Sequence, residues 1–200
     1  MTEEKTLTYS LNIELSDREI FLIGQIMAQW GLLEHTVFTQ TLLTFETSED
    51  EEPQLPKEMN NIQFSGVLEL WKQRVIEPET NEHYQKLSEQ FDEIVRLKPG
   101  RDALIHGMWR WNPDEISKIT SVRVRKRQIV EFHFTADDLE DFRRRVSSVN
   151  FHIRYPGGIE DLAQERAKEG IYMSRRFLAA MSGDVVENDW LSDLLGSKKR

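Results

Sequence analysis

The sequence has no cysteine, and its five histidines are scattered without a close pair. The absence of thiols excludes disulfide bonds, thiolate zinc sites and a cysteine nucleophile. A metal ion held by histidines is not expected either, because such sites need several imidazoles close together. We therefore predict no metal site and no cofactor, and any catalysis has to use ordinary side chains.

Long apolar runs are also absent. No stretch could span a bilayer, and residues 1–5 lack the basic and then apolar pattern of a secretory signal. We expect a cytoplasmic protein without membrane contact. The 200 residues, 38% of them hydrophobic, are enough for one core. The predicted organisation is a single domain over residues 1–182, followed by a flexible tail over 183–200.

Positive charge is scarce in the first half of the chain. Residues 1–100 carry 8 basic and 19 acidic side chains, whereas residues 101–200 carry 18 and 16, within a formal net charge of −9. Affinity for nucleic-acid phosphates comes mainly from Lys and Arg, so the protein as a whole is a poor nonspecific binder. Any contact with a nucleic acid is expected to be local and to lie in the second half.

Apolar residues recur at three- and four-residue intervals over most of the chain, which predicts helices buried on one face. Ser16 and Glu19 form the pattern of a capping box at the start of the first helix. Pro99-Gly100 predicts a break between two helices, and the prolines of residues 46–57 predict a flexible acidic loop. The predicted helices span residues 17–44, 58–76, 79–97, 101–108, 136–152 and 159–181.

Residues 118–134 have a different pattern, in which apolar and polar residues alternate on either side of Lys126-Arg127-Gln128. This alternation predicts a β-hairpin, although the turn residues are not the favoured ones. The predicted fold class is mainly α, a helical bundle with a small β-hairpin insertion.

One short stretch carries a recognisable chemical pattern: Arg101-Asp102, three further residues, and then His106-Gly107. Histidine can take or give a proton near neutral pH, and arginine can hold a phosphate with two parallel hydrogen bonds. These are the two groups that metal-free RNA cleavage needs. We therefore predict Arg101 as the phosphate holder, His106 as the acid-base residue, and Asp102 as a supporting residue.

Helical spacing refines this prediction. Asp102 and His106 are four residues apart and share a helix face, so the carboxylate could orient the imidazole. Arg101 projects about 140° away from His106 at ~3.6 residues per turn, so one copy is not expected to converge well on a phosphate. Two copies across a symmetric dimer could form a shared cleft, which predicts a homodimer.

Structural explanations of the same residues remain open. His106-Gly107 can be a helix end, where a histidine favours the dipole and glycine stops the helix. Arg127 with His133, and Arg145 with His152, repeat similar spacings, and we interpret both as coincidences. Glu34, one turn after Trp30, is either a partner of Arg101 or a solvated surface residue.

The motif and its surroundings resemble the HEPN superfamily of helical ribonucleases and nucleotide-binding domains. The resemblance rests on Arg101-Asp102-x3-His106-Gly107-x-Trp109, on Gly24-x5-Trp30-Gly31-x2-Glu34, and on a second helix with Phe64 and Trp71. It spans roughly residues 16–180. It implies a helical bundle that dimerises so that both Arg/His pairs line one cleft and cut RNA without metal.

The resemblance also implies a setting, because many such proteins serve toxin–antitoxin or antiviral systems, with an antitoxin-like protein as partner. Other members act only as binding modules, so the alternative is a noncatalytic module for a partner protein or a nucleotide. The cluster around the hairpin is either a path for phosphates or a charged edge that discourages strand pairing. The candidate RNA-binding residues are Arg110, Arg123, Arg125, Lys126 and Arg127, with the run of residues 143–145 as a further possibility.

Overall fold

The computed structural model describes residues 15–45, 55–79, 83–111, 115, 117–125 and 127–170. Most of the predicted acidic loop, the predicted tail and Lys126 lie outside these residues. The chain divides between Ile153 and Arg154 into two compact units, which are described separately below.

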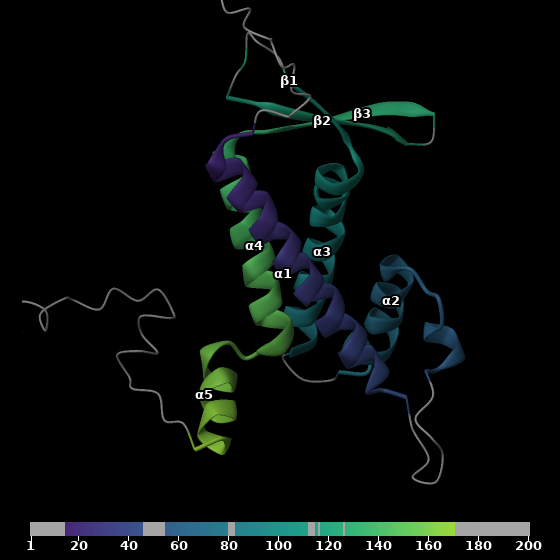
Figure 1. The fold of residues 1–200 in the computed structure, drawn as a ribbon. Helices are drawn as coiled ribbons and strands as arrows, with labels where there is room; N and C mark the ends of the chain where they lie inside the picture. Colours follow the sequence, from purple (N-terminus) through teal and green to yellow (C-terminus); the bar gives the residue numbers. More distant parts are fainter. Residues whose placement is uncertain are drawn as a thin grey trace, which may run out of the picture. The chain divides into compact units, whose positions relative to one another are not determined.

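The first unit is mainly α with a small antiparallel sheet, as the sequence predicts (Figure 1). Its elements in chain order are α1 (Asp17–Leu42), the 3-10 turn η1 (Lys57–Met59), α2 (Phe64–Trp71), the π-helical turn η2 (Lys72–Ile76), α3 (His83–His106), β1 (Met108–Trp111), β2 (Ile119–Arg125), β3 (Gln128–Phe134) and α4 (Ala136–Arg154).

Helix α1 begins with the predicted capping box. The backbone N–H of Glu19 donates to Ser16 Oγ at 3.3 Å, and the backbone N–H of Ser16 donates to Glu19 Oε2 at 2.7 Å. The apolar stripe of α1 is buried in the core, where Ile26, Trp30 and Leu33 have no exposed surface. Helix α1 therefore forms one wall of the core along its whole length.

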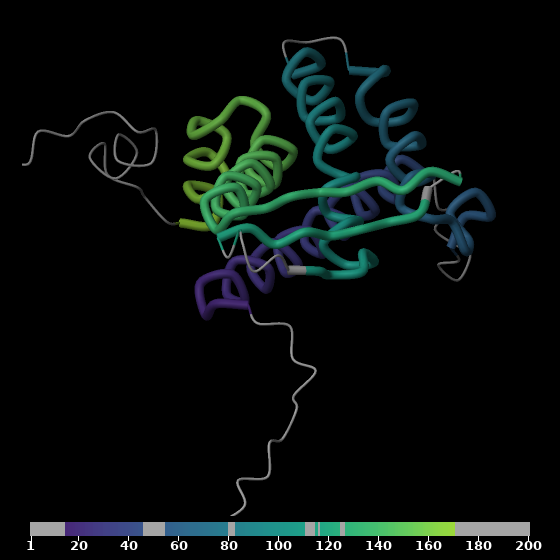
Figure 2. The backbone as a smooth tube through the Cα atoms, turned by 90° about the horizontal axis from the view of Figure 1, so that it is seen from above, coloured from purple at the N-terminus to yellow at the C-terminus, as the bar shows by residue number. Residues whose placement is uncertain are grey.

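The sheet lies across one end of α1, α3 and α4 (Figures 1 and 2). Its strand order is β1-β2-β3, with both pairs antiparallel, and the predicted hairpin is confirmed as β2 and β3. The last pair, Arg125 with Gln128, encloses a two-residue turn, in which Arg127 has φ 66° in the left-handed region. Strand β1 differs from the prediction, in which Met108 ends the helix over residues 101–108.

Helix α3 corrects the prediction of a break at Pro99-Gly100. It runs without interruption from His83 to His106, with Pro99 inside it. Packing explains why the helix continues past Pro99. Ala103 is fully buried, and a Cβ on Gly100 would lie 2.9 Å from the Phe142 ring. The burial after the proline offsets the hydrogen bond that Pro99 cannot donate.

Helix α3 ends against the sheet. A Cβ on Gly107 would lie 1.7 Å from Ser121 Oγ, so only glycine fits there. The Ser121 hydroxyl donates to the carbonyl of Ala103 at 2.6 Å, and the Gly107 N–H donates to the same carbonyl at 3.0 Å. The end of α3 is thereby fixed to β2, which positions His106 relative to the sheet.

The predicted helix over residues 58–76 is also corrected. The chain forms η1, turns at Asn60-Asn61, and begins α2 only at Phe64. Asn61 has φ 56°, a left-handed conformation that asparagine tolerates better than most residues. The turn places Gln63, Phe64 and Ser65 beside α3, where they contribute to the cavity described below.

Helix α4 begins with a cap at Thr135. The Thr135 hydroxyl accepts from the backbone N–H of Asp138 at 3.1 Å, and the Asp138 carboxylate accepts from the backbone N–H of Thr135 at 2.8 Å. Hydrogen bonds then join α4 to α1: the Asn150 amide donates to the Gln29 carbonyl at 2.9 Å. These contacts complete the core around α1.

The second unit contains α5 (Ile159–Lys168) among its described residues. The predicted helix over 159–181 is too long, because α5 ends at Lys168 and Gly170 has φ 77°, a conformation typical of a helix stop. In the part of the chain that the structure describes, no helix has the length and hydrophobicity needed to cross a membrane.

Candidate active site

The predicted catalytic residues lie around one open cavity of ≈ 340 Å³. Four parts of the first unit form its walls: α1, the start of α2 with the residue before it, the last turns of α3, and β2. The lining side chains are Trp30, Glu34, Gln63, Phe64, Ser65, Lys98, Arg101, Asp102, His106 and Arg123. The structure therefore brings Arg101 and His106 to one cavity within a single chain, although their helical positions differ by about 140°.

Arg101 is held between two carboxylates. Its Nη2 donates to Glu34 Oε1 and its Nη1 donates to Asp102 Oδ1, both at 3.2 Å. The guanidinium carbon lies 5.7 Å from the centre of the Trp30 ring, within the range of a cation–π contact. The side chain is only 19% exposed, so the guanidinium is fixed before any ligand arrives.

Glu34 connects this arginine to the core. Its Oε1 also accepts from Trp30 Nε1 at 2.8 Å, so a single oxygen serves both donors. Trp30 is fully buried and meets Phe64 edge to face, with 6.1 Å between the ring centres. Of the two interpretations of Glu34, the structure confirms the contact with Arg101.

Asp102 is surrounded by positive charge. Its Oδ2 accepts from Lys98 Nζ at 3.0 Å and lies 3.6 Å from Arg123 Nη1, while Oδ1 contacts Arg101. Burial disfavours the charged carboxylate, but the hydrogen bonds and charges of Lys98 and Arg101 outweigh it and lower the pKa of Asp102. Asp102 is therefore an anion at neutral pH.

His106 is exposed in the last turn of α3 and makes no hydrogen bond or ion pair with another described residue. The expected orientation of its imidazole by Asp102 is therefore wrong within the described structure. Lys98 lies one turn before Asp102 on the same helix face, and its ammonium group, not His106, donates to that carboxylate. The imidazole of His106 is left open to solvent at the rim of the cavity.

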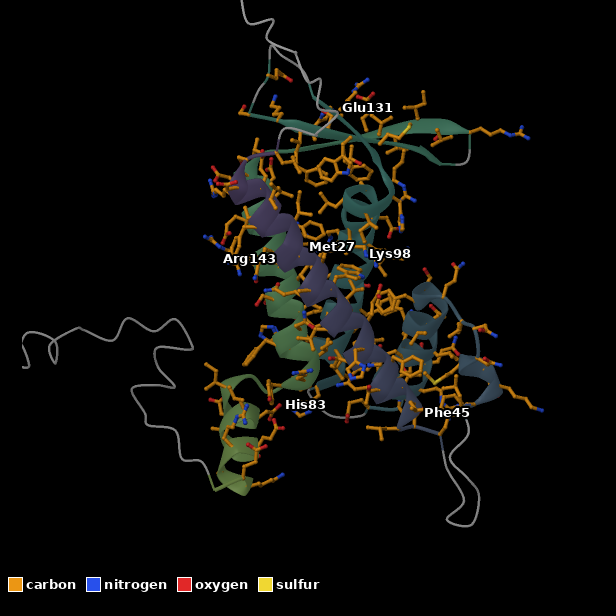
Figure 3. The ribbon with its side chains drawn as sticks, viewed as in Figure 1. Met27, Phe45, His83, Lys98, Glu131 and Arg143 are labelled. Carbon is orange, nitrogen blue, oxygen red and sulfur yellow. The ribbon has the colours of Figure 1, made fainter. Side chains whose placement is uncertain are left out.

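The predicted RNA-binding residues are not gathered in one place. Arg123 lines the cavity, and Arg127 is exposed in the hairpin turn. Arg110 forms an ion pair with Glu131 at 2.7 Å, and Figure 3 shows Glu131 on the side of the sheet that faces away from the helices. The side chain of Arg125 and all of Lys126 lie outside the description.

The arginine run on α4 is paired with acidic neighbours. Arg143 and Arg144 both contact Glu140, at 2.6 and 3.1 Å, and Arg145 reaches Glu93 on α3 at 2.7 Å. Each of the three is therefore partly neutralised within the fold. This arrangement is typical of a solvated helix face rather than of a continuous phosphate path.

A second open cavity of ≈ 350 Å³ shares Ser65, Lys98 and Asp102 with the first. It lies between α2 and α3, and Figure 3 shows Lys98 on the side of α3 toward α2. Its remaining lining is mostly apolar and consists of Leu68, Glu69, Phe91, Val95 and Pro99. The two cavities differ in chemistry, one polar and cationic, the other largely apolar.

Lys98, Gln63 and Ser65 are site residues that the sequence analysis missed. The four-residue spacing of Lys98 and Asp102 could have revealed the first, because side chains at this spacing meet on a helix. The other two come from a turn at Asn61 that the helical pattern concealed. Counting charges, three cations and two carboxylates surround the cavity, which leaves one net positive charge with His106 neutral.

Comparison with family models, with curated proteins and with solved structures found no match. The assignment of function therefore rests on the site itself. Within the described residues there is no cluster of three or more His, Asp or Glu side chains placed to hold a metal ion.

Proposed function

We propose that the protein is a metal-independent endoribonuclease of HEPN type that acts through Arg101 and His106. One observation supports this most directly: both side chains border the same cavity, which also contains Lys98 and Arg123. A phosphodiester placed there would meet two further cations beside the arginine. The resemblance of the motif to HEPN proteins adds a role in toxin–antitoxin or antiviral defence to this proposal.

The contacts of Arg101 suit a phosphate holder. A guanidinium has five N–H donors, and the two carboxylates take one from each terminal nitrogen. Of the three that remain, the Nε–H is buried, and one N–H on Nη1 and one on Nη2 are left for two parallel bonds to a phosphate. Glu34 and Asp102 act as positioning residues, since they fix the plane of the guanidinium without touching the substrate.

In the proposed reaction the ribose 2′-oxygen attacks the phosphorus, and the bond from phosphorus to the 5′-oxygen breaks. One base takes the 2′-proton and one acid protonates the departing 5′-oxygen, which gives a 2′,3′-cyclic phosphate and a 5′-hydroxyl. In a homodimer, His106 of each copy would serve one of these roles. Arg101 would offset the charge that develops on the phosphate.

A second candidate is a noncatalytic module for a partner protein or a nucleotide. The observation in its favour is the closed ion network of Glu34, Arg101 and Asp102, which has a structural role even without a substrate. In that case His106 would be only a helix-end residue, followed by the Gly107 stop. The two candidates differ in what His106 contributes, so this residue decides between them.

The deciding experiment is cleavage of a mixed RNA pool in EDTA by wild type, His106→Ala and Arg101→Lys. His106 is exposed, so its removal leaves the fold intact, and lysine keeps the charge of Arg101 while losing the two parallel bonds. We expect cyclic phosphate ends from the wild type and a loss of rate of about a hundredfold or more in both variants. Losses of this size are typical when an acid-base residue or a donor to the developing charge is removed.

Matched controls are His133→Ala and Arg166→Ala. The His133 side chain is 57% exposed on β3, and Arg166 of α5 pairs with Glu169. Neither residue is among those that line the cavity. Both controls should cut like the wild type, and light scattering should show a dimer throughout. No cutting by the wild type, or cutting that His106→Ala leaves unchanged, would refute the nuclease and favour the binding module.

A further inference from the structure

We propose that the second cavity is a nucleobase subsite that selects an unpaired guanine, with Glu69 as the specificity-determining residue. This proposal rests on the proposed function, because it takes the neighbouring cationic cavity as the phosphate site. The substrate class that follows is single-stranded RNA with guanine beside the phosphate held by Arg101.

The two cavities are consecutive sections of one surface along α3. Phe91, Val95, Lys98, Asp102 and His106 follow one another at intervals of three or four residues, so they share a helix face. At about 1.5 Å per residue the face is roughly 22 Å long. A short stretch of extended RNA can therefore contact both cavities, with a base in one and the next phosphate in the other.

The walls of the second cavity suit the faces of a base. Leu68, Val95 and Pro99 are apolar, and Val95 is 49% exposed, so an apolar surface remains uncovered. Flat aromatic ligands gain affinity from such surfaces, and proteins that bind single strands use them for unpaired bases. The position of Lys98 on the shared wall puts a positive charge where the phosphate of the same nucleotide would lie.

Glu69 supplies the hydrogen-bonding edge. Its Oε1 accepts from Gln73 Nε2 at 3.2 Å, and the remaining acceptor positions of the carboxylate are available to a ligand. Asp102, the other carboxylate on this cavity, is already held by Lys98, Arg101 and Arg123. Recognition of a base at this position therefore depends on Glu69.

A carboxylate has acceptors only, and the bases differ in what they offer it. Guanine presents two adjacent donors on its Watson–Crick edge, the N1–H and the N2 amino group, which match the two oxygens. Adenine and cytosine each present one amino group beside an acceptor, and uracil presents one N–H between two carbonyls. Guanine is therefore the base that Glu69 favours, and the base must be unpaired to expose this edge.

The test measures binding separately from cleavage. Fluorescein-labelled deoxytetranucleotides lack the 2′-hydroxyl and cannot be cut, so their affinities can be measured by anisotropy in EDTA. The four probes are thymidine tetranucleotides with G, A, C or T at the second position. We expect the guanine probe to bind at least about fivefold tighter than the others, as one bidentate pair provides.

Glu69→Gln should remove this preference. A glutamine amide presents a donor beside an acceptor, and each of the four bases has an edge with an adjacent donor and acceptor, so the advantage of the guanine probe should disappear. Glu89→Gln is the matched control: Glu89 also accepts from a glutamine one turn away, Gln85 at 3.3 Å, and it lies outside both cavities. Val95→Glu places a negative charge in the cavity and should weaken all four probes.

The outcomes distinguish failure of the guanine subsite from failure of the proposed nuclease activity. Guanine-selective binding that Glu69→Gln abolishes supports the subsite, even if the RNA pool is never cut. Equal affinity for all four probes, no binding of any, or a preference that Glu69→Gln leaves unchanged would overturn it. RNA cleavage without guanine at the cut site would leave the nuclease in place and overturn the subsite alone.

Discussion

Replacing Asp102 by asparagine tests whether the ion network of the cavity stabilises the fold. The carboxylate accepts one hydrogen bond from Lys98 and one from Arg101, and it lies 3.6 Å from Arg123. Asparagine keeps the shape and one acceptor oxygen but turns an amino group toward one of these cations. The three cations then lose their shared counter-charge.

The expected loss follows from these contacts. A hydrogen bond between charged partners contributes about 1.5–3 kcal/mol, and the more distant pair with Arg123 adds less than about 1 kcal/mol. Asp102 is 19% exposed, so water replaces part of what is lost. We expect Asp102→Asn to lower the free energy of unfolding by about 2 kcal/mol at pH 7, which moves the urea midpoint down by roughly 1 M.

The pH dependence has a definite sign. The pKa of Asp102 is lower in the folded protein than its ordinary value of 3.8, so folding favours the ionised form. The stabilisation is complete above pH 3.8 and is lost as the pH falls through the lower folded pKa. The difference in unfolding free energy between wild type and Asp102→Asn should therefore be constant from pH 7 to 5 and narrow toward pH 3.

The assay is urea unfolding followed by circular dichroism over this pH range. Asp141→Asn is the control, because Asp141 is 69% exposed and lies 3.9 Å from Arg145, so its loss should cost less than about 0.5 kcal/mol. A difference for Asp102→Asn as small as that of the control, or one that does not change down to pH 3, would show that the network is not stabilising in this way.

Three further substitutions test local features of the fold: the close contact at Gly107, the open position at Gly31 and the cap at Thr135. Gly107→Ala should destabilise by about 2 kcal/mol or more, because its Cβ would lie 1.7 Å from Ser121 Oγ; an unchanged melting temperature would contradict this. Gly31→Ala should instead stabilise by up to about 1 kcal/mol, since it lies within α1 with nothing within 4 Å of the added carbon; thermal melting would show the rise. Thr135→Ala removes the cap of α4 and should cost about 1 kcal/mol in urea unfolding, and a loss below 0.3 would argue against the cap.

The sequence predicted those features that depend on local pattern. The capping box at Ser16 needs only residues three positions apart, and the strand alternation of residues 118–134 is likewise local. These were confirmed. Local patterns failed where distant residues decide the outcome: Pro99 remains helical because the following turn packs against Phe142 and Ser121.

The same distinction applies to the site. The motif drew attention to Arg101, Asp102 and His106, but it does not contain Glu34, Lys98 and Arg123, which pair with the first two. The spacing suggested that Asp102 would meet His106, whereas Lys98 competes for it from the same helix and Arg123 from β2. Neither the cavity nor its apolar neighbour could be predicted, because both depend on how α2 packs against α3.

Glu34 Oε1, which accepts from both Trp30 and Arg101, couples the cavity to the fluorescence of a tryptophan. An anion that draws Arg101 toward itself changes the electron density on that oxygen, and the indole bonded to it is sensitive to such changes. Binding of an anion in the cavity should therefore alter the fluorescence of Trp30. No direct contact between the ligand and the indole N–H is needed, because that N–H donates to Glu34. The protein then carries its own reporter for ligand titrations, and replacing the other four tryptophans by phenylalanine would isolate that signal.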